Sequence, residues 1–147
     1  MKVLVLLLLA SSSLPPSHGA NPTMRCFIQP KSVKGALKQS AAVFSGEVLQ
    51  IKSGGNYLEV RLRVERSWKG VSTEEVAVLT DSTVESPHYR VGDKYLVFAG
   101  IRDGKLFTGT CSRTKKLEYA QEDLQQLEED KSRKEKRSSV SVVIALK

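Results

Sequence analysis

The most regular alternation of apolar and polar residues along the chain lies between residues 57 and 68. Leu58, Val60, Leu62, Val64 and Trp68 fall on one parity, and charged residues fill most of the other. A period of two is typical of a strand that places one face in a core and the other in water. The pattern therefore predicts a long, half-buried strand with all five apolar side chains on its inner face.

The preceding apolar run, residues 42–51, keeps no single phase. Its phase changes around Ser45-Gly46, and a glycine at such a point permits a β-bulge. Residues 52–56 include two glycines and an asparagine, which tolerate the backbone of a tight turn. We expect a bulged strand and a long hairpin.

Three further strands are expected at residues 74–80, 94–99 and 105–109, the last two joined by a turn at Asp103-Gly104. A short helix over residues 32–41 precedes them, with Val33, Ala36 and Leu37 at helical spacing. The pattern predicts a mainly β fold, a five-stranded, partly open OB-fold-like barrel with a short N-terminal helix.

Apolar residues return at helical spacing near the C-terminus, at Leu117, Ala120, Leu124 and Leu127. They predict an amphipathic helix packed on the barrel, with Thr114 as its N-cap. The mixed charges up to residue 137 indicate either a solvated helix end or a linker. Residues 138–147 turn apolar and are too short to span a bilayer, so we expect an added strand or a β-prone tail.

The first twenty residues read as a secretory signal peptide. A lysine at position 2 precedes an apolar run, and small residues follow near Gly19 and Ala20. We therefore expect three parts: a signal peptide at 1–20, a barrel domain at 21–130, and a charged linker with an apolar tail at 131–147. The mature protein is expected to be secreted and extracellular, or periplasmic in a bacterium.

Two cysteines, Cys26 and Cys111, remain after the signal. An even number of cysteines in an exported chain favours a disulfide. The alternative is a pair of free, buried thiols. If the bridge forms, it closes nearly the whole domain.

No constellation of catalytic or metal-ligating residues stands out. His18 belongs to the signal, and His88 is alone in a polar loop. Neither cysteine lies in a zinc-binding spacing. We expect a non-enzyme without metal or cofactor. The formal net charge of +7 suits polyanions such as glycosaminoglycan or nucleic acid. Poor interleaving with aromatic residues argues against nucleic acid and favours the alternative, a like-charged surface that only keeps the protein soluble.

Several segments together resemble the netrin-like module, the OB-fold domain of the tissue inhibitors of metalloproteinases. The segments that carry this resemblance are Cys26 to Pro30, residues 41–48, Val64-Glu-Arg-Ser-Trp-Lys-Gly70, residues 91–98 and Gly109-Thr-Cys-Ser-Arg-Thr114. The resemblance covers about residues 24–128 and is greatest for single-domain exported members. It implies a protein-binding module related to these inhibitors.

The sequence departs from that family at its functional end. The inhibitors begin with Cys-x-Cys, whose first cysteine chelates the protease zinc, whereas this chain has Met24-Arg25-Cys26. The cysteine that pairs with the family's first one is also absent between residues 81 and 89. The resemblance thus implies a binding edge without the zinc-chelating group, formed by Met24, Arg25, Cys26, Phe27, Ile28, Pro30 and His88.

A second hypothesis is binding of an extracellular polyanion such as a heparin-like glycosaminoglycan. The candidate residues lie on the predicted basic face of the barrel and are Lys52, Arg61, Arg63 and Lys69. The partner could thus be a protease, a matrix protein or a glycosaminoglycan, and the sequence alone leaves these alternatives open.

Overall fold

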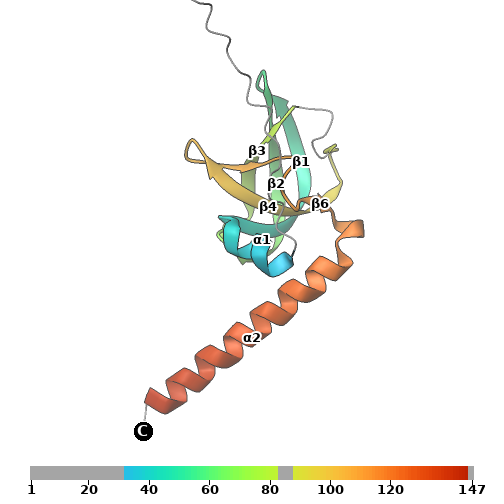
Figure 1. Cartoon of the computed structure of the whole chain (residues 1–147). Helices are drawn as coiled ribbons and strands as arrows, with labels where there is room; N and C mark the ends of the chain where they lie inside the picture. Colours follow the sequence, from blue (N-terminus) through green and yellow to red (C-terminus); the bar gives the residue numbers. More distant parts are fainter. Residues whose placement is uncertain (1–31, 83–87, 146–147) are drawn as a thin grey trace, which may run out of the picture.

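Five strands close into a ring. The computed structural model describes residues 32–82 and 88–145, with side chains described up to residue 138. Within this part the strands run in the order β1-β2-β3-β5-β4, and β1 pairs back with β4 (Figure 1). Only the β3–β5 pair is parallel. The strands are β1 (Ala42–Ser53), β2 (Tyr57–Lys69), β3 (Glu75–Asp81), β4 (Lys94–Arg102), β5 (Lys105–Thr108) and the short β6 (Lys115–Lys116), which pairs with β4. The predicted mainly β, five-stranded barrel is confirmed.

A bulge lies at the predicted position, Ser45-Gly46, but its extra residue belongs to β2, between Val64 and Arg66, and not to β1. The register of β1 against β2 shifts between these residues, and again on either side of them. A side chain at Gly46 would place its Cβ 2.5 Å from the carbonyl oxygen of Arg63, so the backbones approach too closely for any other residue. The first half of β1 also pairs with β4, which buries both of its faces. This double burial explains why the apolar run keeps no single phase.

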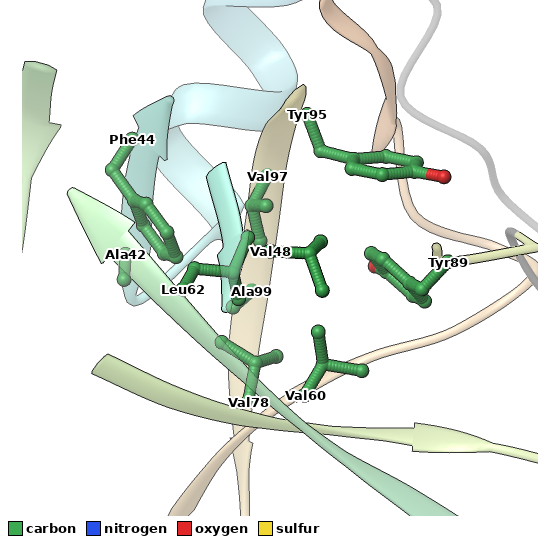
Figure 2. Packing of buried hydrophobic residues seen from close by; sticks show 10 residues of the cluster. All are labelled: Ala42, Phe44, Val48, Val60, Leu62, Val78, Tyr89, Tyr95, Val97 and Ala99. Atoms are coloured by element: carbon green, nitrogen blue, oxygen red, sulfur yellow. The ribbon is translucent and has the colours of Figure 1, made fainter. Parts of the chain in front are cut away.

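The barrel interior is filled by one apolar cluster. Figure 2 shows its side chains converging from β1, β2, β3 and β4, together with Tyr89 from the segment before β4. The predicted inward residues Val60 and Leu62 are fully buried, and Leu58 and Val64 pack against them. The cluster thus holds together all sides of the ring.

A second apolar cluster lies outside the ring, between the barrel and the helices. Val43, Leu96 and Phe98 contribute from the strands, and Trp68 packs against them. Trp68 was expected on the same face as Leu58, and this prediction was wrong. Gly46 pairs with Val64 but Ser45 pairs with Arg66, so β2 carries an extra residue between them and its later side chains change face.

The first helix, α1, spans Val33–Gln39, slightly shorter than the predicted 32–41. The Ser32 hydroxyl accepts a hydrogen bond from the Gly35 amide at 3.1 Å and caps its N-terminus. The predicted apolar residues Val33, Ala36 and Leu37 are all buried in the outer cluster. The helix therefore covers one outer face of the barrel.

The second helix, α2 (Gln121–Ala145), starts later than expected. The chain first forms β6 and a 3-10 turn, η1 (Leu117–Tyr119). The predicted N-cap at Thr114 was wrong, because its hydroxyl accepts from the Phe98 amide at 2.9 Å instead. The predicted stripe does pack on the barrel: Ala120 and Leu127 are buried, and Leu117 and Leu124 pack beside them.

The C-terminal residues continue this helix. No break occurs at residues 130–137, and the helix runs on to Ala145, where an added strand or irregular tail was expected. Residues 131–138 of the helix are exposed to solvent. Figure 1 shows this end of the helix projecting away from the barrel. Within residues 32–82 and 88–145, no helix has the length and apolar character needed to cross a membrane.

Candidate functional site

The turn Trp68-Lys69-Gly70 joins the barrel to α1. The Lys69 ammonium donates hydrogen bonds to the carbonyl oxygens of Leu37 at 2.9 Å, Lys38 at 3.2 Å and Ser40 at 2.5 Å. These carbonyls lie at the C-terminal end of α1, where no helical donor remains and a cation is favoured. Lys69 therefore fixes the end of this helix to β2.

The same turn joins the barrel to α2. The indole nitrogen of Trp68 donates to a carboxylate oxygen of Glu128 at 2.6 Å. The other oxygen of Glu128 pairs with Arg66, whose guanidinium carbon lies 5.6 Å from the centre of the Trp68 ring. Since Glu128 belongs to α2, one carboxylate connects that helix to two residues of β2.

Gly70 makes this turn possible. Its φ of +71° lies in the left-handed region, and an added Cβ would meet the carbonyl oxygen of Ala41 at 2.1 Å. The chain can therefore pass closely behind the start of β1 only with glycine at this position.

A groove lies between the two helices above this turn, with a volume of ≈ 460 Å³. Leu37 and Trp68 supply its apolar part, and Asp130 is its only acidic residue in the described part of the chain. Six basic residues line it: Lys34, Lys38, Lys69, Arg133, Lys134 and Arg137. The groove therefore carries a strong excess of positive charge.

The charges in the groove are unevenly neutralised. Asp130 lies 3.5 Å from Arg133, and Lys69 is occupied by the carbonyls of α1. Lys34, Lys38 and Lys134 are exposed, and their ammonium groups form no ion pair or hydrogen bond with any described residue. These three are the cations best placed to meet an anionic ligand.

The predicted protein-binding edge falls largely outside the described residues. This applies to Met24, Arg25, Cys26, Phe27, Ile28 and Pro30. His88 is described: it is exposed, and its carbonyl accepts the Tyr95 hydroxyl at 2.7 Å. The edge itself therefore stays a prediction.

The predicted basic face of the barrel does not form one patch. Arg61 lies 4.0 Å from Glu75, and Arg63 lies 3.9 Å from Glu47. Lys52 is exposed near the tip of the hairpin. Lys69 is the last residue of β2, at the opposite end of the hairpin, and its ammonium group contacts α1. Partial neutralisation and this separation make these four residues a poor anion site compared with the groove.

Sequence reasoning missed the groove, although part of its signal was present. Lys34 and Lys38 are one helical turn apart, as are Arg133 and Arg137. The missing facts were that α2 continues beyond residue 130 and that it lies beside α1. Both depend on tertiary packing.

The segment 109–114 forms a second joint with α2. Arg113 donates to both carboxylate oxygens of Asp123, at 2.8 and 3.0 Å, and Lys115 lies 3.0 Å from the same group. Burial alone raises the pKa of Asp123, but the hydrogen bonds from Arg113 and Lys115 outweigh it and hold that pKa below its ordinary value. Thr108 and Thr114 bridge the same corner to β4 through the Phe98 carbonyl.

Cys111 lies in this corner, half-buried, and is not a free thiol. Its predicted partner, Cys26, lies outside the described residues, so the pairing of the two stays a prediction. In the part of the chain that the structure describes, no three His, Cys, Asp or Glu side chains gather in a way that could hold a metal ion.

The sequence matches no protein-family model and no curated protein. The functional conclusions below therefore rest on the residues and on the geometry just described.

Proposed function

We propose that this chain is a non-catalytic, exported binding domain of the netrin-like type, related to metalloproteinase inhibitors. The single observation that supports this best is the role of the two most specific segments among those that carry the resemblance. Within a five-stranded ring, both Trp68-Lys69-Gly70 and the corner around Cys111 lie where described strands are tied to helices. Motifs with such roles are expected to persist when the binding surface changes.

The partner in this proposal is a protein, bound through the edge that includes Met24 to Pro30 and His88. Its chemistry differs from zinc chelation. With the signal removed near Ala20, the nitrogen of Cys26 is in a peptide bond, and an amide nitrogen is a far weaker zinc ligand than a free amine. The missing first bridge also leaves the edge less preorganised, so part of the binding energy is spent on ordering it.

The test is a titration of the purified, secreted protein against a panel of metalloproteinases, before and after N-terminal acetylation. We expect no nanomolar inhibition, and any weaker binding should survive acetylation. Tight inhibition that acetylation abolishes would contradict the proposal, since it would require a free α-amino group at the zinc. Hydrolysis of any substrate by the protein itself would contradict the non-catalytic role.

A further inference from the structure

Basic side chains recur along both walls of the groove between α1 and α2. Lys34 and Lys38 stand on the α1 wall, four residues apart, which corresponds to roughly 6 Å along the helix axis. Arg133, Lys134 and Arg137 form the α2 wall with a similar repeat. Because the cations repeat along both walls, a ligand with anionic groups at intervals can meet several of them at once.

The walls of this groove are held in place before any ligand arrives. Lys69 fixes the end of α1, and the Trp68–Glu128 hydrogen bond fixes α2. Figure 1 shows the two helices next to each other below the barrel, and they are in direct contact. Preorganised cations cost less to bring together on binding, which favours affinity.

The shape and composition of the groove distinguish between polyanions. Nucleic acid recognition in a groove usually adds aromatic faces for the bases. Among the described residues that line this groove, Trp68 is the only aromatic one, and it is half-buried, hydrogen-bonded to Glu128 and has Arg66 near its ring. A bilayer presents a flat anionic surface, but these cations line two facing walls. A flexible chain bearing sulfate groups fits both observations.

We propose that the α1–α2 groove binds a linear sulfated polysaccharide, with Lys34, Lys38 and Lys134 as the principal contacts. None of the described residues that line the groove belongs to the predicted protein-binding edge, so this inference does not depend on the proposed inhibitor-related function. Of the four residues that the sequence analysis proposed for polyanion binding, Lys69 lines this groove, whereas Lys52, Arg61 and Arg63 lie elsewhere on the barrel.

The experiment compares two triple variants of the full secreted chain, each of which removes three positive charges. The groove variant is Lys34→Gln, Lys38→Gln and Lys134→Gln. The control is Lys52→Gln, Arg61→Gln and Arg63→Gln. Heparin oligosaccharides are titrated at several salt concentrations, with the emission of Trp68, the only tryptophan of the chain, as one readout and calorimetry as the other. Thermal melts of both variants check that the fold is intact.

We expect the groove variant to lose at least about tenfold in affinity, because three charge contacts disappear, and the control to stay within about threefold of the parent. The groove variant should also show a shallower dependence of affinity on salt. Equal losses in both variants would overturn the site, since binding would then follow net charge. Absence of heparin binding by the parent chain would overturn it as well.

Two further arms test the ligand class. A desulfated chain of the same length should bind much more weakly than heparin. Duplex DNA and vesicles rich in phosphatidylserine should bind no better than the groove variant binds heparin. If the parent protein bound DNA or vesicles more tightly than heparin, that polyanion and not a polysaccharide would be the ligand class. None of these outcomes bears on protease binding, because residues 24–30 are unchanged throughout.

Discussion

At the scale of single residues, a few polar side chains decide how the barrel is joined to its surroundings. Asp123 is the clearest case, with its side chain 3% exposed and three donor atoms of Arg113 and Lys115 within 3.0 Å. A buried carboxylate is costly unless it is paired in this way. It therefore acts as a specific lock between the corner at residues 109–114 and the first turn of α2.

Replacing Asp123 by asparagine should lower the free energy of unfolding by about 2–4 kcal/mol at pH 7, because two cations lose their buried partner. The folded-state pKa of Asp123 is lower than its unfolded value. Its stabilisation is thus fully present above about pH 4 and is lost as the pH falls through the folded-state pKa. Urea titrations between pH 2 and 7 should show the two proteins converging in acid. Replacement of the exposed Glu74 by glutamine serves as the control. A difference in unfolding free energy between the parent and the Asp123 variant that stays the same at every pH would contradict this role of the carboxylate.

Replacement by phenylalanine should change the free energy of unfolding in opposite directions at two neighbouring tyrosines of the core. The Tyr89 hydroxyl is buried without a hydrogen-bond partner in the described part of the chain, whereas the Tyr95 hydroxyl donates to the His88 carbonyl at 2.7 Å. Their rings lie 4.6 Å apart (Figure 2). Tyr89→Phe should be neutral or stabilising by up to about 1 kcal/mol, and Tyr95→Phe destabilising by about 1 kcal/mol. Equilibrium unfolding measures both, and a marked loss for Tyr89→Phe would mean that its hydroxyl is paired.

At the scale of elements, the long helix α2 has two unequal halves. Its first turns carry Asp123, Leu127 and Glu128, which attach it to the strands. Beyond Asp130 the side chains described, up to residue 138, are exposed. The first half therefore belongs to the folded core, while the second extends it and forms one wall of the groove.

Truncation of the chain after Asp130 should leave the barrel folded. The melting temperature is expected to change by no more than about 5 °C, since no buried apolar side chain is known to be lost. The same truncation removes Arg133, Lys134 and Arg137, one wall of the groove, and should weaken the binding of heparin oligosaccharides by at least about tenfold. Calorimetry and circular dichroism of the truncated protein test both parts. A fall of more than 15 °C would show that residues beyond 130 are integral to the domain.

The elements also show where sequence patterns suffice and where they fail. Alternation along β2 and the phase change at Ser45-Gly46 were enough to predict the strands, the position of the bulge and the barrel. The extra residue of this bulge lies in β2, between Val64 and Arg66, and no glycine in that strand signals it, so Trp68 was predicted on the wrong face. Residues 140–144 are mostly β-branched and indicated a strand, but extending an existing helix is easier than nucleating a new element.

At the scale of the whole molecule, the described barrel holds the groove in place, while the proposed protein-binding edge includes residues outside the described part of the chain. The groove between the helices carries six basic residues, and a chain with a net charge of +7 attracts polyanions to it. The predicted protein-binding edge includes both His88 and Cys26. The proposed bridge from Cys26 to Cys111 would attach that edge to the corner that already locks α2.

Mass spectrometry of the secreted protein, intact and after non-reducing digestion, tests the central claim most directly, because it determines the mature N-terminus and the state of both cysteines together. We predict an N-terminus near Ala20 or Asn21 and a single linked peptide pair that contains Cys26 and Cys111. A chain that begins at Cys26, with a free α-amino group able to chelate zinc, would contradict the proposed function. Two free thiols in the exported protein would contradict the bridge.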